Sequence, residues 1–197
     1  MIGIVGYGAG NIRSVSNALK ILNVEHFVSN NPKELEKADK IIFPGVGEAR
    51  SAMECLAKSG LTEWLKNVKV PFLGICLGMQ LLFERTTERN TNCLGVIKGT
   101  NEKFPERNHG LKVPHMGWND VEILVNCPIF HDIKSGEYFY FVHSYYAPIT
   151  SETIGKTFYG IEFGSVVWHN NYYGVQFHPE KSGKIGLKLL SNFVNLC

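Results

Sequence analysis

The sequence lacks the features of nucleic-acid-binding and membrane proteins. Its 20 basic and 18 acidic residues give a net charge of only +2. The basic residues are scattered, without a run of the kind that nucleic-acid binding needs. No stretch is long and apolar enough to span a bilayer, and the N-terminus has neither the charged nor the apolar region of a signal peptide. We therefore expect a cytoplasmic protein that binds neither nucleic acid nor membrane.

The cysteine and histidine patterns that hold disulfides or metals are also missing. The five cysteines are an odd number at wide spacings, which leaves no disulfide framework and no C-x-x-C motif. The seven histidines form no H-x-x-x-H pair, so we expect no metal site and no cofactor. Metal-free chemistry at Cys76 becomes the leading enzyme hypothesis. The roles of the other cysteines stay open: Cys55, Cys93, Cys127 and Cys197.

Strand and helix patterns alternate through the first half of the chain, which predicts a parallel α/β sheet. The predicted strands are residues 2–5, 24–28, 40–43 and an apolar run that ends at Ile75. The predicted helices are residues 12–22, 32–38, 49–58 and 62–67. Ligand sites of open α/β folds lie at the carboxyl ends of such strands.

The second half of the chain has shorter strands and more turn residues. Turns are predicted at residues 98–99, 108–110 and 134–136, strands at 137–142, 164–168 and 172–177, and a final helix at 185–194. This pattern indicates antiparallel strands added to the parallel sheet. We expect residues 1–197 to form one α/β domain, with an open, mostly parallel sheet flanked by helices.

Cys76 lies where the apolar run ends and a helical pattern begins. Gly74 and Gly78 flank it at minus two and plus two, as in a cysteine version of the G-x-S-x-G nucleophile elbow. This turn would present the thiol at the sheet edge and place the N–H of Leu77 where it can bind an oxyanion. The alternative is a buried structural cysteine beside two packing glycines.

A base for this nucleophile is predicted at the end of the strand 172–177, where His178, Pro179 and Glu180 follow. Residues two apart in an extended segment point to the same side, so Glu180 can hold one imidazole nitrogen while the other faces Cys76. The alternative is a surface loop.

A glycine-rich turn at residues 6–11 follows the first strand. Gly6 and Gly8 match the first two glycines of a dinucleotide fingerprint, but Asn11 occupies the third position and no acid closes the second strand. A dinucleotide-binding oxidoreductase is therefore the weakest interpretation.

Together, residues 70–80, 44–48 and 176–182 resemble the signature segments of the class I, triad-type glutamine amidotransferases. Within that family, the opening G-x-G-N-I-R-S-V and the segments 113–121 and 139–145 are similar to the glutaminase subunits that serve imidazole glycerol phosphate synthase in histidine biosynthesis. Relatives that act on chorismate usually have P-G-P-G in the turn and histidine after the elbow glycine, where this chain has Val46 and Met79.

The resemblance implies a flavodoxin-like fold and hydrolysis of L-glutamine by a triad of Cys76, His178 and Glu180. It also implies an oxyanion hole and a set of substrate-binding residues. The oxyanion-hole residues are Val46, Gly47 and Leu77, and the substrate-binding residues are Gly45, Gly47, Gln80, Ser144 and Tyr145. His143 is expected to be structural rather than a second base.

The family also implies a partner: a (β/α)8 synthase subunit that forms a heterodimer with the glutaminase and receives its ammonia. The residues in the docking motifs are Asn11, Trp118, Tyr138 and Lys181. The substrate of the synthase subunit, a phosphoribulosyl formimino carboxamide ribotide, is expected to activate the glutaminase through the turn 45–47. Two alternatives stay open: a partner that aminates sugars for surface polysaccharides, and a non-catalytic scaffold for a barrel partner.

Overall fold

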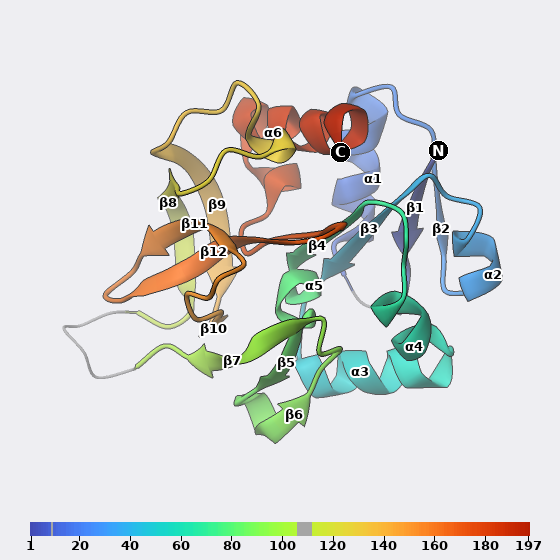
Figure 1. Cartoon of the computed structure of the whole chain (residues 1–197), viewed down its shortest axis with the longest axis horizontal. Coiled ribbons are helices and arrows are strands. Elements are labelled where there is room, and N and C mark those ends of the chain that lie inside the picture. The colour runs from blue at the N-terminus through green and yellow to red at the C-terminus, as the bar shows by residue number, and fades with distance from the viewer. Residues whose placement is uncertain (9, 106–111) are drawn as a thin grey trace.

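The computed structural model describes residues 1–8, 10–105 and 112–197. Nine of its strands form one sheet, in the order β2-β1-β3-β4-β13-β12-β11-β8-β9 (Figure 1). Their bounds are β1 Ile2–Val5, β2 His26–Ser29, β3 Lys40–Gly45, β4 Phe72–Cys76, β8 His115–Ile123, β9 Glu137–His143, β11 Thr153–Phe158, β12 Glu162–His169 and β13 Tyr172–Val175. The strands from β2 to β13 pair in parallel, and those from β13 to β9 pair antiparallel.

Six α-helices occur in these described ranges. They are α1 Ile12–Ile21, α2 Pro32–Leu35, α3 Ala49–Lys58, α4 Leu61–Lys66, α5 Leu77–Gln80 and α6 Gly183–Leu196. In the part of the chain that the structure describes, no helix is long and apolar enough to cross a membrane.

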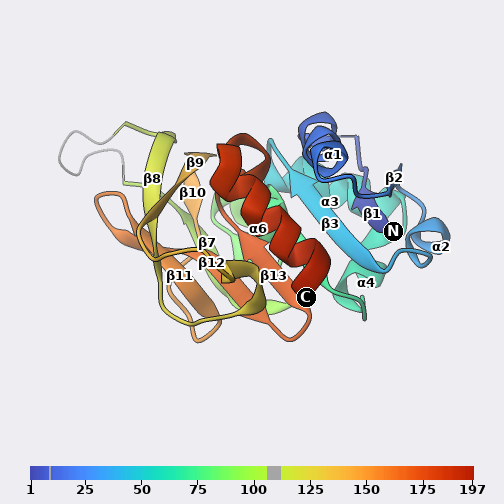
Figure 2. The same ribbon diagram turned by 90° about the horizontal axis from the view of Figure 1, so that it is seen from above.

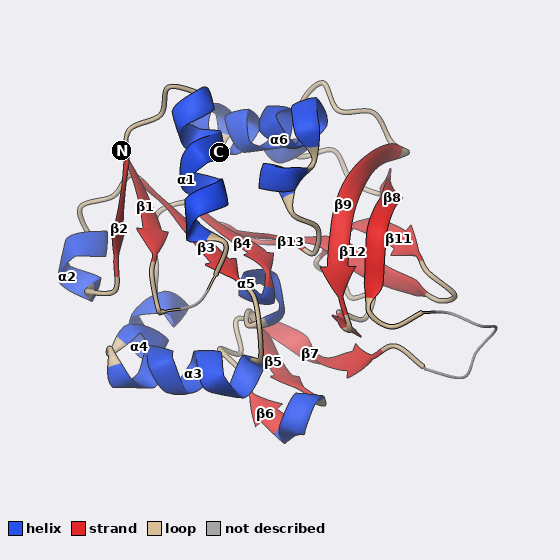
Figure 3. Ribbon diagram, turned by 180° about the vertical axis from the view of Figure 1, so that it is seen from behind, coloured by secondary structure: helices blue, strands red, loops and turns tan. Residues whose placement is uncertain are grey.

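Helices cover both faces of the parallel half of the sheet, with α1 and α6 on one face and α3 and α4 on the other (Figures 2 and 3). Successive strand side chains alternate between the two faces. Ile42 and Ile75 therefore join the core that includes residues of α1 and α6, whereas Phe43 and Phe72 join the core that includes residues of α3 and α4. The apolar runs of the central strands are buried on both sides, which is why their sequences do not alternate.

A second sheet of four strands lies beside the turn that follows Cys76 and has the order β10-β7-β5-β6. Its strands are β5 Phe83–Thr86, β6 Thr91–Asn92, β7 Ile97–Lys103 and β10 Tyr145–Tyr146, and the 3₁₀ helices are η1 Glu88–Asn90, η2 Pro128–Phe130 and η3 Pro179–Lys181. Because β10 pairs with β7, this sheet brings Tyr145 close to the segment after the elbow.

The predicted fold class is confirmed, but several boundaries differ. The turn predicted at residues 98–99 is wrong, because Lys98 and Gly99 lie inside β7 at a register shift opposite β5, where Gly99 has a φ of 129°. Glycine and lysine together mark a bulge here rather than a chain reversal. The second strand begins at His26 rather than at residue 24. The turn predicted at residues 108–110 lies outside the described residues.

Three glycines allow the turn after Cys76 to approach the ends of β3 and β4. A Cβ on Gly78 would overlap the carbonyl oxygen of Phe43, and one on Gly74 would lie 2.6 Å from the carbonyl oxygen of Gly78. Gly45 pairs with Cys76 across β3 and β4, and a Cβ there would lie 2.7 Å from the backbone nitrogen of Gly78. The obstructing atoms belong to the backbone and cannot rotate away, so each position requires glycine.

The substitution Gly78→Ala should lower the free energy of unfolding by about 3 kcal/mol or more, because β3 must move to admit the methyl group. Urea unfolding measures the loss. Gly60→Ala is a matched control, since Gly60 has a φ of 71° but no atom near its Cβ position. That change should cost about 1 kcal/mol from backbone strain alone. Equal losses in the two variants would contradict the packing argument.

Candidate active site

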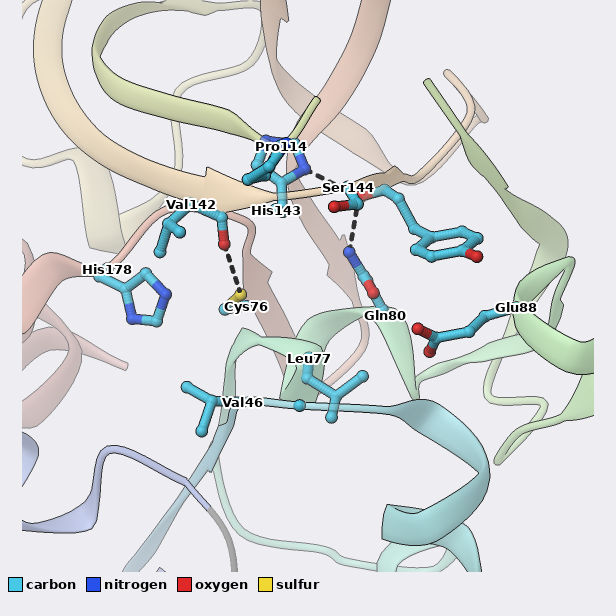
Figure 4. Close-up of a pocket in the computed structure, with 12 residues that line it drawn as sticks. Val46, Cys76, Leu77, Gln80, Glu88, Pro114, Val142, His143, Ser144 and His178 are labelled. Carbon is cyan, nitrogen blue, oxygen red and sulfur yellow. Dashed lines mark hydrogen bonds between the residues drawn. The ribbon is translucent and has the colours of Figure 1, made fainter. Parts of the chain in front are cut away.

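A cavity of about 350 Å³ opens at the carboxyl ends of β3 and β4 (Figure 4). It is lined by Val46, Gly47, Cys76, Leu77, Gln80, Glu88, Pro114, Val142, His143, Ser144, Tyr145 and His178. The wall thus combines segments from both sheets and from the turn between β3 and α3. This position matches the carboxyl strand edge where open α/β folds bind ligands.

Cys76 ends β4 with a φ of 55° and a ψ of −108°, a backbone conformation that residues other than glycine rarely adopt. The sharp turn directs the thiol into the cavity instead of the sheet, as the elbow pattern predicts. The thiol lies 3.9 Å from the carbonyl oxygen of Val142, to which it donates, and Nε2 of Gln176 lies 3.7 Å from Sγ. Cys76 is only 7% exposed, so its sulfur is largely shielded from water.

His178 and Glu180 meet as the sequence predicts, with Nδ1 and Oε1 2.8 Å apart. The same carboxylate oxygen accepts a hydrogen bond from Nδ2 of Asn11 at 2.8 Å, and Asn11 in turn accepts one from Ser14 at 2.7 Å. Because the carboxylate holds Nδ1, the other imidazole nitrogen is left for the cavity. That nitrogen, Nε2, is buried and has no hydrogen-bond partner among the described residues.

The surroundings of His178 raise its pKa to about 10. Burial lowers the pKa, but the adjacent Cys76 sulfur and the hydrogen-bonded Glu180 carboxylate raise it by more. The imidazolium form is therefore favoured beside these two groups. A protonated imidazole next to the sulfur can serve as a proton donor to a leaving group.

The turn after β3 supplies the opposite wall. Val46 and Gly47 line the cavity with Leu77, as predicted for the oxyanion-binding residues, and Gly47 has a φ of 96°. Gly45 is not among the residues that line the cavity, and its role as a substrate-binding residue stays a prediction. It is packed against the elbow instead, where it allows the backbone of Gly78 to come close.

Gln80, Ser144 and Tyr145 all line the cavity, as their prediction as substrate-binding residues requires. Nε2 of Gln80 donates to the carbonyl oxygen of Tyr145 at 2.7 Å and to Oε1 of Gln176 at 2.9 Å. Both amide hydrogens of Gln80 are thus used within the protein. Its direct contact with a substrate stays a prediction.

Glu88 is a cavity residue that the sequence analysis missed. It belongs to η1, and its Oε2 accepts a hydrogen bond from the backbone nitrogen of Ala49 at 2.8 Å. This contact ties the carboxylate to the start of α3, at the rim formed by the turn after β3. Its sequence context, E-R-T-T-E-R, is that of an exposed polar segment and contains no signal of a site.

His143, which lines the cavity, forms a buried pair with His115. Nε2 of His143 lies 2.9 Å from Nδ1 of His115, and Nδ1 of His143 lies 2.7 Å from the carbonyl oxygen of Tyr145. Burial lowers the pKa of His143 to about 3 and that of His115 to about 4. A histidine held neutral by burial and bonded to a carbonyl suits the structural role that we expect for His143.

Of the residues predicted to dock a partner, three are exposed and one is half-buried. Trp118 and Tyr138 are 55% and 56% exposed, and the register of β8 and β9 puts them on one face of this strand pair. Lys181 is exposed in η3. Asn11 is half-buried against Glu180, so its observed contact is with the triad.

The remaining cysteines have no disulfide partner, and Cys55 among them is exposed. Within residues 1–8, 10–105 and 112–197, no group of three or more histidine, cysteine or acidic side chains is arranged to hold a metal ion.

Comparison with known proteins gives full-length similarities. The family described as "Glutamine amidotransferase class-I" matches residues 4–196. "Imidazole glycerol phosphate synthase subunit HisH" of Methanocaldococcus jannaschii is 52% identical over 199 residues, which cover 100% of both chains. The protein of the same name from Bacteroides fragilis is 45% identical over 99% of each chain. A solved structure described as "Crystal structure of glutamine amidotransferase" has a TM-score of 0.75 at 18% identity, covering 99% of this chain and 97% of the other.

The buried histidine pair should make the folded protein sensitive to acid. Below a pH of about 6.5 the unfolded chain protonates both imidazoles, whereas the folded pair stays neutral until about pH 4 or below. The free energy of unfolding should therefore fall as the pH drops from about 6.5 to about 4, by up to about 1.4 kcal/mol per pH unit for each histidine. Denaturant unfolding across this range measures the slope.

His115→Gln cannot take up a proton and should lose about half of that slope. His131→Gln is the matched control, because His131 is exposed. If the free energy of unfolding falls equally steeply with pH in the wild type and in His115→Gln, the acid sensitivity does not come from the buried histidine pair.

Proposed function

The chain belongs to the class I glutamine amidotransferase family, and from this premise we propose that it is the glutaminase subunit of an imidazole glycerol phosphate synthase. It hydrolyses L-glutamine to glutamate and ammonia in histidine biosynthesis. The proposal is best supported by the 52% full-length identity to an archaeal protein of that name. The placement of Cys76 and His178 around one cavity, with Glu180 behind the imidazole, agrees with it. The relatives' names favour this partner over one that aminates sugars.

In the proposed reaction, the thiolate of Cys76 attacks the side-chain amide carbon of glutamine. The N–H of Leu77 and an N–H of the Val46–Gly47 turn bind the oxyanion that forms. The imidazolium of His178 protonates the departing ammonia and leaves a thioester on Cys76. His178 then takes a proton from water as the water attacks the thioester and releases glutamate. Glu180 fixes the imidazole tautomer throughout.

The substrate's amino-acid end would lie toward Glu88, the carboxylate on the cavity wall. The α-ammonium group of glutamine is a cation that needs such a partner once it leaves water. Ser144 and Tyr145 line the same cavity, and we expect their backbone groups to form hydrogen bonds with the substrate there. Val46 and Gly47 complete the pocket opposite them.

The proposed partner is a (β/α)8 synthase subunit that forms a heterodimer with this chain and takes the ammonia directly. Ammonia is mostly protonated at neutral pH, so a shielded path keeps it nucleophilic. Trp118 and Tyr138 give the outer face of β8 and β9 an exposed aromatic character that suits an interface. Lys181 and the turn before Asn11 would extend the docking surface. Residues 1–197 acting as one cytoplasmic domain, without a cofactor, complete the proposal.

The proposed pairing with a synthase subunit predicts that glutaminase activity depends on the partner and its substrate. Glutamate release should be slow for the chain alone and should rise about tenfold or more when a barrel subunit and its ribotide are added, because the ribotide completes the oxyanion hole through the turn 45–47. Cys76→Ala should abolish the activity, whereas Cys55→Ala, which removes an exposed thiol, should leave it intact. No change on adding barrel and ribotide would refute the partner and its coupling.

Replacement of Glu88 should affect substrate binding more than chemistry. Glu88→Gln keeps an oxygen that can accept from Ala49 but removes the charge, so we expect KM for glutamine to rise about tenfold with little change in kcat. Glu84→Gln is the matched control: Glu84 also accepts from a backbone N–H, that of Gly99, but does not line the cavity. Steady-state kinetics of the two variants separate the effects. A lower kcat at an unchanged KM in Glu88→Gln would contradict this role.

A further inference from the structure

Gln176 is a buried side chain to which the mechanism above gives no role. It is 0% exposed and lies between the end of β13 and His178. Its Nε2 is 3.7 Å from Sγ of Cys76, so the amide touches the reacting atom. A buried amide whose hydrogens point to a thiol differs from a packing residue, because it presents a donor to an atom that becomes negatively charged.

Neighbouring hydrogen bonds fix the direction in which this amide points. The carbonyl oxygen of Tyr145 can only accept, so the group of Gln80 that lies 2.7 Å away is its NH₂. The same NH₂ lies 2.9 Å from the Gln176 side chain, which must therefore turn its oxygen toward Gln80. The NH₂ of Gln176 is then left facing Cys76.

We propose that Gln176 is a catalytic residue whose amide N–H donates a hydrogen bond to the sulfur of Cys76 and stabilises the thiolate. This inference rests on the proposed glutaminase function, in which that thiolate is the nucleophile.

The surroundings of the sulfur make this donor important. In the thiol form, Sγ donates to the carbonyl oxygen of Val142 at 3.9 Å. Once the proton leaves, the negative end of that carbonyl dipole faces the thiolate and repels it. The positive end of the Gln176 N–H dipole also faces the thiolate and attracts it. Hydrogen bonds to an ion are stronger than those between neutral groups, and burial strengthens them further. Gln176 therefore favours the charged form over the neutral one.

The chain of hydrogen bonds continues beyond Gln80 to His115, a buried residue of β8. The Tyr145 carbonyl also accepts from Nδ1 of His143, which leaves Nε2 of His143 to accept from His115 at 2.9 Å. All these groups are thus held in one orientation, from the buried histidine pair to the nucleophile. A fixed donor does not have to reorient when charge forms on the sulfur, which is the condition for electrostatic stabilisation in an active site.

The rate at which iodoacetamide alkylates Cys76 tests the proposal without any need for glutamine turnover. The full-length chain is treated at pH 5 to 10, and alkylation is followed residue by residue by peptide mass spectrometry. Gln176→Met keeps the length of the side chain and removes the donor. At pH 7 its Cys76 should react about tenfold more slowly, with the rising limb of the pH profile moved up by about one unit. The titratable groups that face the sulfur, His178 and Tyr7, are unchanged.

Two controls separate the loss of this donor from a general loss of stability. Asn192→Leu removes another buried amide, one that donates to Ile129 and His131 far from the cavity, and should leave Cys76 reacting at the wild-type rate. The exposed Cys55 reports the reactivity of an ordinary thiol in the same molecules. If Gln176→Met does not fold, Gln176→Glu replaces the donor with an anion of the same shape and should slow alkylation at least as much.

Wild-type alkylation of Cys76 in a folded Gln176→Met variant, across the whole pH range, would overturn the proposal. A slowed variant with an unchanged Asn192→Leu control would support it. The outcome does not depend on the proposed function. If the assembled pair fails to hydrolyse glutamine while the difference in alkylation persists, the glutaminase assignment fails and the hydrogen bond to the sulfur stands.

Discussion

The close approach of three backbone segments at the elbow is the constraint on which the rest of the site depends. Gly78 lies against the carbonyl of Phe43 so closely that no side chain fits between them. This contact holds the turn that gives Cys76 its rare backbone conformation. Because β3 and β4 also pair at this point, with Gly45 opposite Cys76, the same backbone segments position Cys76 and the turn that follows β3.

A second constraint comes from burying charge next to this elbow. The carboxylate of Glu180 has no exposed surface, and burying an ionised group is costly unless hydrogen bonds compensate for the lost contact with water. Asn11 supplies one of these bonds from the loop before α1, and Ser14 fixes Asn11 in turn. The first and last parts of the chain are thus joined through the contact of Asn11 with the His178–Glu180 pair. The glycine-rich turn before Asn11, which resembles half of a dinucleotide fingerprint, leads the chain to this contact.

The sequence predicts the elements of the fold and the triad because their signals are local. Glycines at fixed spacing about Cys76 and the H-P-E tripeptide each specify a backbone shape within a few residues. Gln176, Glu88 and the contact of Asn11 with Glu180 could not be found in this way. Each depends on a partner more than thirty residues away, which only the strand order brings close. Whether residues 1–197 act as one domain stays a prediction.

Strand β9 runs from an exposed face of the protein to the Cys76 thiol. Tyr138 and Val142 lie on the same face of the strand, four residues apart, because strand side chains alternate. The exposed aromatic face around Tyr138 is the proposed docking surface, and the carbonyl oxygen of Val142 accepts a hydrogen bond from the Cys76 thiol. Strand β9 thus carries both the exposed aromatic residue Tyr138 and the carbonyl oxygen that accepts from the Cys76 thiol.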